Sequence, residues 1–116
     1  MGLQIYAGKG FDTQKAERFF KERRIAYQRV DVLKYGIGRR ELESVAAAVG
    51  LDGLCDKDSK AYRESVIAYT QSRETILSGL MEKPQLLRLP IVRNGRRATA
   101  GYAPDIWEQW IADGIK

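Results

Sequence analysis

The sequence of 116 residues contains no histidine and a single cysteine, Cys55. Without histidine, neither a Ser-His nor a Cys-His catalytic pair can form, and one cysteine cannot supply a Cys-x-x-Cys redox motif or an internal disulfide bond. The same shortage argues against a zinc cluster, whose ligands are mainly cysteine and histidine. We therefore predict no metal site, and most familiar nucleophilic and redox chemistry is excluded.

Long hydrophobic runs are also missing. No apolar run approaches the ~18 residues that a membrane-spanning helix needs, and the first ten residues lack the apolar stretch of a secretory signal. A content of 44% hydrophobic and 30% charged residues fits one compact domain with one core. We expect a single domain, residues 1–116, that is cytoplasmic and makes no membrane contact.

Positive charge is concentrated in the first third of the chain. Residues 1–40 carry ten basic and four acidic residues, whereas residues 41–116 carry ten and eleven. Such an excess can attract nucleic acid, an acidic protein or an anionic ligand. However, no run of five like charges occurs and aromatic residues are not interleaved with the basic ones, so direct nucleic-acid binding is not expected.

The first part of the sequence has the pattern of a βαβ unit. Residues 3–7 are apolar and bounded by glycines, which predicts a short buried strand. Asp12 or Thr13 is expected to cap a helix that ends near Arg24. Residues 25–33 are rich in strand-forming residues, so a second strand should lie parallel to the first after a right-handed crossover.

Three helices are predicted in the middle of the chain, at about residues 39–83. The first has a regular apolar stripe and ends at Gly50. Ser59 is expected to cap the second, and the third spans about residues 72–82. The apolar residues expected to share one face of the second helix are Tyr62, Val66 and Tyr69.

The last third of the chain predicts a hairpin followed by a helix. Strands are expected at residues 89–93 and 96–100, because Asn94-Gly95 is typical of a type I′ turn. Pro104 and Gly114 are suited to begin and end the final helix. Three arginines flank the turn: Arg93, Arg96 and Arg97. We expect them to be solvated charges at a sheet edge, where they would discourage aggregation.

This order of elements is that of a thioredoxin-like fold, with a βαβ half, an all-helical insertion and a ββα half. The segment IYAGKGFDTQKAERFFKERRIAYQRVDV resembles the beginning of the arsenate reductase (ArsC) and Spx family. The segment EKPQLLRLPIVRNGRRATAGYAPDIWEQW resembles the end of the same family, with matching spacing across nearly the whole chain. The resemblance implies an α/β protein with a mixed four-stranded sheet and a cis peptide bond at Leu89-Pro90.

The same resemblance places the nucleophilic cysteine of the reductases at Phe11. A helix N-terminus lowers the pKa of a cysteine and so favours the reactive thiolate, which phenylalanine cannot form. The second cysteine of the Spx branch falls at Gln14. The oxyanion-binding arginines of the family are also absent. Their positions are occupied here by Leu89, by Tyr102, and by Asp56 or Lys57. We therefore expect a redox-inactive relative of the reductases.

The backbone before the cis-proline of thioredoxin folds pairs with an extended peptide or with glutathione, which needs no cysteine. The residues of this predicted groove are Gly10, Phe11, Asp12, Thr13, Leu89 and Pro90. Docking of a ligand there and simple covering of the groove by Phe11 are both compatible with the sequence. For the glycines around Lys9, a tight strand-to-helix turn is favoured over anion binding at the helix N-terminus, because no phosphate-loop pattern is present.

The resemblance implies a binding or regulatory protein without a cofactor. Spx-type relatives bind the RNA polymerase α subunit, so Lys15, Arg18 and Lys21 are expected to contact an acidic protein partner, with RNA polymerase as the first candidate. The alternative is a thiol oxidoreductase that uses Cys55, or a thiol of a partner, together with glutathione. Free cysteines are commonly buried apolar residues, and adjacent acidic residues oppose thiolate formation, so a structural role is favoured for Cys55. The oligomeric state is not predicted.

Overall fold

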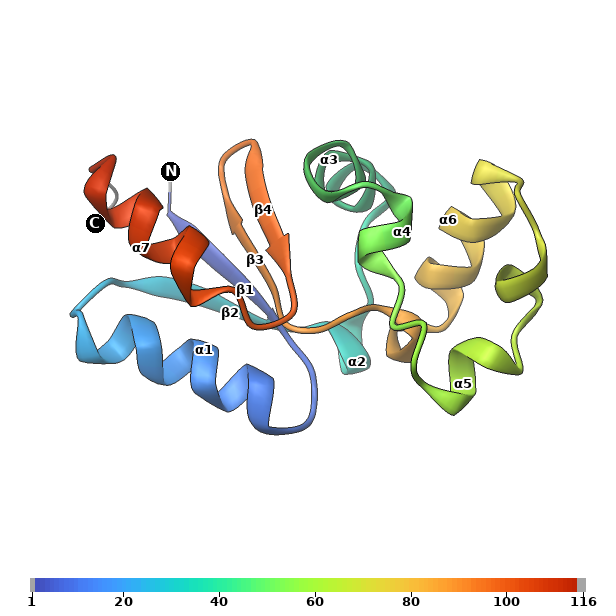
Figure 1. Cartoon of the computed structure of the whole chain (residues 1–116), viewed down its shortest axis with the longest axis horizontal. Helices are drawn as coiled ribbons and strands as arrows, with labels where there is room; N and C mark the ends of the chain where they lie inside the picture. Colours follow the sequence, from blue (N-terminus) through green and yellow to red (C-terminus); the bar gives the residue numbers. More distant parts are fainter. Residues whose placement is uncertain (1, 115–116) are drawn as a thin grey trace.

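The computed structural model of the chain describes residues 2–114, which form an elongated body with extents of 40, 25 and 24 Å (Figure 1). In chain order, the elements are β1 (Leu3–Ala7), α1 (Phe11–Glu22), β2 (Tyr27–Asp31), α2 (Val32–Tyr35), α3 (Arg39–Val49), α4 (Leu51–Leu54), α5 (Lys60–Arg63), the 3₁₀ helix η1 (Val66–Tyr69), α6 (Arg73–Glu82), the 3₁₀ helix η2 (Pro84–Leu86), β3 (Ile91–Asn94), β4 (Arg97–Ala100) and α7 (Pro104–Ala112). Among the described residues, no helix has the length and apolar character needed to cross a membrane.

The four strands form one mixed sheet in the order β2-β1-β3-β4. β1 and β2 run parallel, with Leu3 opposite Tyr27, while β3 is antiparallel to both β1 and β4. The βαβ half and the ββα half therefore share a single sheet, in which β1 and β3 are the inner strands. This confirms the predicted α/β class and thioredoxin-like order.

Helices α1 and α7 cover one face of the sheet (Figure 1). Leu3 and Ile5 are two residues apart in β1, so the pleat of the strand directs both side chains to the same face. The buried residues of this cluster are Leu3, Ile5, Ala16, Phe19, Phe20, Ile25, Val92, Trp107 and Trp110. Trp107 is fully buried, and its indole N–H donates a hydrogen bond to Thr99 Oγ1 at 2.8 Å, so α7 is fixed against β4 by both packing and polar contact.

The helical insertion packs on the opposite face of the sheet and extends beyond it (Figure 1). Tyr6 and Ile91, from the two inner strands, reach into its apolar cluster, which the helices complete. The remaining buried members are Val32, Ile37, Leu42, Val45, Ala46, Leu54, Cys55, Ile67, Leu77, Leu80, Leu86 and Leu87. The sheet is therefore sandwiched between two apolar layers, which is how α/β domains bury both faces of a sheet.

The start of α1 differs from the prediction. The helix begins at Phe11 with Gly10 as its N-cap residue, and neither Asp12 nor Thr13 caps it. Gly10 has φ 109° and ψ −178°, a conformation essentially restricted to glycine. The Thr13 hydroxyl instead accepts a hydrogen bond from the Gly8 N–H at 3.1 Å, so it holds the loop in front of the helix.

The helix predicted after Ser59 is not continuous. Ser59 does cap α5, where its hydroxyl accepts from the Tyr62 N–H at 3.1 Å, but α5 has only four residues and η1 follows separately. The Ser65 hydroxyl donates to the Tyr62 carbonyl oxygen at 2.6 Å, a local bond that competes with helix continuation. As a result, Val66 and Tyr69 are 70% and 83% exposed and are not core residues.

The hairpin turn lies one residue later than predicted. Asn94 is the last residue of β3 and pairs with Arg97, so Gly95 and Arg96 form the turn. Gly95 has φ 63°, but Arg96 does not have positive φ. A type I′ turn needs positive φ at both central residues, so this turn is of another type.

Candidate functional site

The loop between β1 and α1 is shaped by two glycines with different roles. Gly8 lies so close to Leu89 that a Cβ atom at this position would be 2.6 Å from Leu89 Cδ1 and 2.8 Å from Leu89 Cβ. Gly10 supplies the positive φ at which the chain enters the helix. The loop before Phe11 is thereby pressed against the segment that precedes β3.

Phe11 is the first residue of α1, and 78% of its surface is exposed. Asp12 is also exposed, whereas Thr13 is buried under the loop. An exposed phenylalanine ring is available for contact with a partner, and whether the groove binds a ligand or is covered by Phe11 stays a prediction.

The Leu89-Pro90 peptide bond is cis, as the resemblance implied. Leu89 is half-buried against Gly8, and Pro90 is buried. The Pro90 carbonyl oxygen accepts a hydrogen bond from the Gly101 N–H at 2.9 Å. The structure therefore brings the Leu89-Pro90 step and the Gly8–Gly10 loop together, with Phe11 projecting from the end of that loop.

A basic hollow of about 300 Å³ lies on the other side of the same loop. The residues that line it are Gly8, Lys9, Arg29, Asp31, Leu33 and Lys34. Three cationic side chains and one carboxylate line the hollow, and one of the three cations, Arg29, is also paired with Glu17. The hollow, which lies where β1 and β2 end, therefore keeps a net positive charge. Anion binding at this loop was the less favoured of the two interpretations of the glycines around Lys9. The sequence did not indicate that Arg29 and Lys34 join Lys9 there, because their meeting depends on the pairing of β1 with β2.

Cys55 lies in surroundings that disfavour its thiolate form. It is only 5% exposed, and its thiol donates to the Leu51 carbonyl oxygen at 3.4 Å. Burial raises the pKa of Cys55, nearby Asp52 raises it further, and Lys57 lowers it only in part. Since the nucleophile is the thiolate, these surroundings suppress nucleophilic chemistry, as expected for a structural cysteine.

The exposed side of α1 carries the basic residues predicted to contact a partner. Lys15, Arg18 and Lys21 are all exposed, and among the described residues no carboxylate lies within 4.0 Å of any of them. Lys15 Nζ lies 5.4 Å from the centre of the Tyr102 ring, which is 44% exposed. Lys15, Arg18 and Tyr102 share a hollow of about 320 Å³.

Tyr102 was not predicted to be part of a binding surface. From the sequence, it was identified only as a position where the family resemblance implies an oxyanion-binding arginine. It comes from the loop between β4 and α7, and its ring packs edge-on against Trp107 with centroids 5.6 Å apart. Only the packing of α7 beside α1 brings it next to Lys15. We define the α1 surface as Phe11, Lys15, Arg18, Lys21 and Tyr102.

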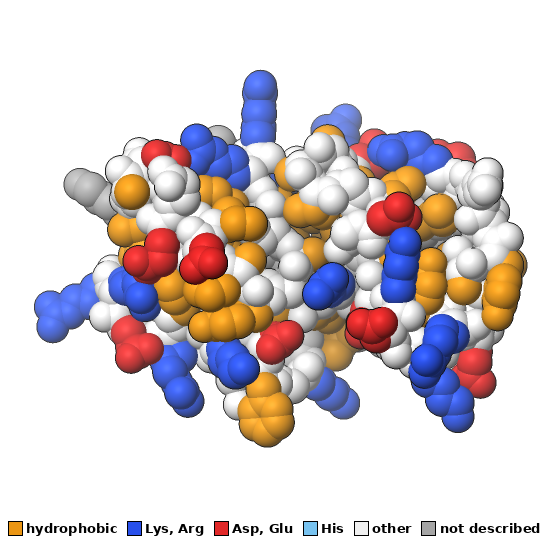
Figure 2. All heavy atoms as spheres, viewed as in Figure 1, with side chains coloured by type: hydrophobic (Ala, Val, Ile, Leu, Met, Phe, Trp, Pro, Cys, Tyr) orange, Lys and Arg blue, Asp and Glu red, His pale blue; other side chains and the backbone are white. Residues whose placement is uncertain are grey.

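Other basic residues of the first third are engaged in ion pairs. Arg23 lies 2.8 Å from Glu108 and above the ring of Phe19, and Arg29 lies 3.4 Å from Glu17. On the face seen in Figure 2, basic and acidic side chains are interspersed rather than gathered in one field. Unpaired basic side chains of this part of the molecule nevertheless remain on the α1 surface and beside Lys9, and Arg24 and Arg40 are also exposed without an ion-pair partner among the described residues.

The chain is similar to known proteins along most of its length. The ArsC family matches residues 11–110. The global transcriptional regulator Spx 2 of Oceanobacillus iheyensis is 26% identical, over 97% of this chain and 96% of the relative. The arsenate reductase of Vibrio cholerae has a TM-score of 0.83 at 21% identity, covering 94% of this chain and 97% of that one. An arsenate reductase (ArsC) related protein from Brucella melitensis has a TM-score of 0.69 at 21% identity, covering 96% and 95%.

The structural similarities show that the fold is that of the arsenate reductases. The family match runs from the first residue of α1 into α7, so it includes the loop-helix junction, the insertion and the hairpin. The mixed four-stranded sheet agrees with what the sequence resemblance implied. By this match over most of its length, the chain belongs to the ArsC family.

Proposed function

We propose that this protein is a redox-inactive regulatory member of the family, which binds a protein partner through the α1 surface. The observation that carries the proposal is the exposed ring of Phe11 at the first position of α1, the position to which the resemblance assigns the reductase nucleophile. A large aromatic ring in water gains free energy when a partner covers it, and aromatic and arginine side chains are common binding hot spots.

The charge of the α1 surface supports an acidic partner. Lys15 and Arg18 follow Phe11 at helical spacing, so the ring and the two cations lie on one side of α1. Because no carboxylate of the described residues neutralises them, they can form ion pairs with another chain. Such pairs at the rim of an apolar contact favour association rate and orientation.

The surroundings of Cys55 support the absence of thiol chemistry. The only thiol of the chain is buried in the insertion, with a raised pKa. Phe11 cannot form a covalent adduct with arsenate or a mixed disulfide. The alternative of an oxidoreductase that uses Cys55 and glutathione therefore receives no support from the geometry.

RNA polymerase is the partner we propose, with its α subunit as the contact. The proposal rests on the similarity to a global transcriptional regulator, Spx 2, over nearly the full length of both chains. A regulator that acts by protein contact needs an exposed surface and no catalytic group. The α1 surface meets this requirement.

Binding to purified RNA polymerase tests the proposal directly. The protein is immobilised, and the core enzyme and the isolated α subunit are passed over it in biolayer interferometry. We expect saturable binding that weakens by about ten-fold or more in Phe11→Ala and in Arg18→Glu/Lys21→Glu, because hot-spot residues contribute roughly 2 kcal/mol or more.

The matched control is Lys60→Glu/Arg63→Glu, which reverses two exposed charges on α5 and should bind like the parent protein. If neither the core enzyme nor the α subunit binds, the proposed partner is wrong. If the control weakens binding as much as Arg18→Glu/Lys21→Glu does, binding depends on general charge and the α1 surface is not the contact.

A further inference from the structure

A row of polar side chains crosses the sheet at the end away from the Phe11 loop. Gln4 of β1 is paired with Gln28 of β2 on one side and with Arg93 of β3 on the other. Residues paired across neighbouring strands point to the same face of a sheet. This face is the one that Tyr6 shares, so the row lies under the helical insertion rather than under α1 and α7.

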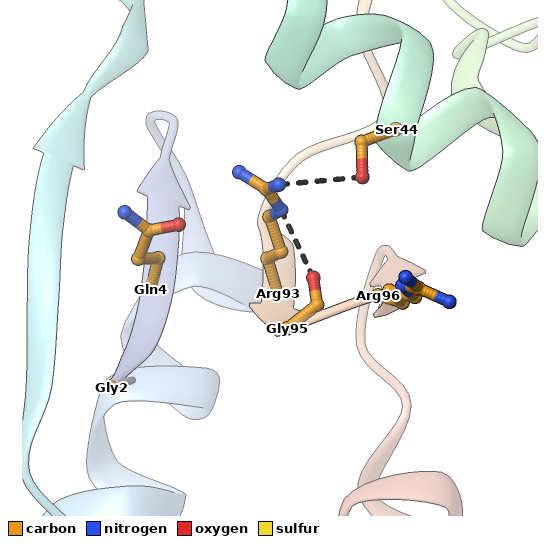
Figure 3. A pocket seen from close by; sticks show the side chains of 6 residues that line it. All are labelled: Gly2, Gln4, Ser44, Arg93, Gly95 and Arg96. Atoms are coloured by element: carbon orange, nitrogen blue, oxygen red, sulfur yellow. Dashed lines mark hydrogen bonds between the residues drawn. The ribbon is translucent and has the colours of Figure 1, made fainter.

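The insertion covers only part of this face. Helix α3 lies over β4, and between α3 and β1 a hollow of about 380 Å³ remains. Its lining residues are Gly2, Gln4, Ser44, Arg93, Gly95 and Arg96 (Figure 3). In Figure 3, the guanidinium of Arg93 stands between Gln4 and Ser44, and Arg96 borders the hollow from the hairpin turn.

Arg93 is held in place but not neutralised. Its Nε donates to the Gly95 carbonyl oxygen and its Nη2 to Ser44 Oγ, each at 3.3 Å. Both acceptors are uncharged, and among the described residues no carboxylate lies within 4.0 Å of the guanidinium. A guanidinium has further N–H donors in a rigid planar fork, so Arg93 keeps donors for another group.

This position corrects the expectation that Arg93 is a solvated charge at a sheet edge. β3 lies inside the sheet, between β1 and β4, and Arg93 is half-buried. A half-buried cation without an anionic partner is unusual, because charged groups away from water are normally paired. Arg97, by contrast, is exposed and paired with Asp113 at 2.9 Å.

One acidic residue lies close by and sets the balance of charge. Glu41 of α3 accepts a hydrogen bond from the Tyr6 hydroxyl, so its carboxylate is already bound. Arg96 adds a second cation at the rim of the hollow. The Glu41 carboxylate keeps its negative charge when it accepts the Tyr6 hydrogen bond, but it does not line the hollow, whereas both guanidinium groups do, so the net charge around the hollow is positive.

We propose that the hollow between β1, β3 and α3 is a binding site for a small anionic metabolite, held by Arg93 and Arg96 through its carboxylate or phosphate group. Guanidinium forks match the geometry of both oxyanions. The side-chain amide of Gln4 offers one donor group and one acceptor group, so it can bind a neutral polar group elsewhere on the same ligand. The volume of the hollow suits a small molecule and not a folded partner.

This site is separate from the proposed protein contact. Gln4 is near the start of β1 and is paired with Arg93 of β3, whereas Phe11 follows the end of β1. The hollow is on the face of the sheet that packs against the insertion, and α1 covers the opposite face. Binding of an anion in the hollow is therefore independent of binding at the α1 surface.

The test is an NMR titration of the isotope-labelled protein. Sodium phosphate, sodium succinate and sodium chloride are added in separate series at matched ionic strength. We expect saturable shifts of the Arg93 Nε–H resonance and of the Ser44 and Gly95 backbone amides with phosphate, with succinate, or with both, and not with chloride. Saturation with phosphate alone identifies a phosphoryl ligand, and saturation with succinate alone identifies a carboxylate.

Three variants locate the site. Arg93→Gln and Arg96→Gln should each weaken binding by about ten-fold or more, the effect of losing a charge-assisted hydrogen bond. Arg96 is exposed, so Arg96→Gln leaves the fold intact even if Arg93→Gln disturbs it. The control is Arg97→Gln, which removes the same charge from the same hairpin outside the hollow and should bind like the parent.

Shifts that are linear and equal in the three salts overturn the proposal. So does a loss of affinity in Arg97→Gln as large as that in Arg96→Gln, because binding would then follow net charge and not the hollow.

Discussion

The Cys55 thiol donates a hydrogen bond to the Leu51 carbonyl oxygen, and the backbone of Cys55 forms an isolated antiparallel bridge with Leu87. Burial disfavours the charged thiolate, which raises the pKa of Cys55. We expect alkylation by iodoacetamide to be severalfold slower in the folded protein than in the urea-unfolded chain, from neutral to alkaline pH. Mass spectrometry of the labelled protein measures both rates.

A thiol-based enzyme would show the opposite behaviour. If Cys55 is alkylated faster in the folded protein than in the unfolded chain near neutral pH, the fold stabilises its thiolate. That result would support the alternative of a thiol oxidoreductase. Cys55→Ala serves as the blank for non-specific labelling. The distinction depends on one side chain, because the protein has no other cysteine.

At the scale of elements, the loop before α1 depends on its fit against the segment before β3. Gly8→Ala would place a Cβ atom 2.6 Å from Leu89 Cδ1. We expect this change to lower the free energy of unfolding by about 1–3 kcal/mol, the usual cost of overpacking. Urea denaturation followed by tryptophan fluorescence measures the loss.

The cause of that loss is tested by a second substitution. Leu89→Ala removes Cδ1 but keeps the Cβ atom, which would still lie 2.8 Å away, so the cost of Gly8→Ala should fall only in part in this background. Gly2→Ala, which meets nothing within 4 Å, is the control and should be near neutral. An equal cost of Gly8→Ala with and without Leu89→Ala would contradict the proposed contact.

At the scale of the whole molecule, Tyr6 connects the sheet to the insertion. Its hydroxyl donates to Glu41 of α3, and burial together with this bond raises the pKa of Tyr6 from 10.0 to about 12. A pKa that is higher in the folded state adds stability below the unfolded value and removes it as pH rises. We therefore expect the free energy of unfolding to decline from pH 10.0 toward about 12.

Tyr6→Phe should make this decline smaller and should also cost about 1–3 kcal/mol at neutral pH, because the Glu41 carboxylate loses a donor. Urea unfolding at a series of pH values measures both effects. Tyr27 also contributes to the decline, since its pKa is raised to about 12 by burial and by Glu17, so Tyr27→Phe is measured in parallel. The same pH slope in the parent and in Tyr6→Phe would exclude Tyr6 as a source.

Most of the fold could be predicted from the sequence. Apolar spacing located the helices at residues 39–49 and 73–82, and the resemblance supplied the thioredoxin-like order and the cis Leu89-Pro90 bond. The errors fell where two local solutions compete. The Thr13 hydroxyl could cap α1 or accept a hydrogen bond from the Gly8 N–H. The bond with Gly8 forms because the loop lies against Leu89, which the sequence does not reveal.

What the sequence determined by itself was chemical capacity. The absence of histidine and of a second cysteine excluded whole classes of catalysis wherever the residues lie, and the spacing of apolar residues indicated most of the buried helix faces, although not at Val66 and Tyr69. The tertiary structure alone decided proximity. Arg93 meets Ser44 and Tyr102 meets Lys15 across long stretches of chain, and such contacts depend on strand register and helix packing, which leave no local pattern in the sequence.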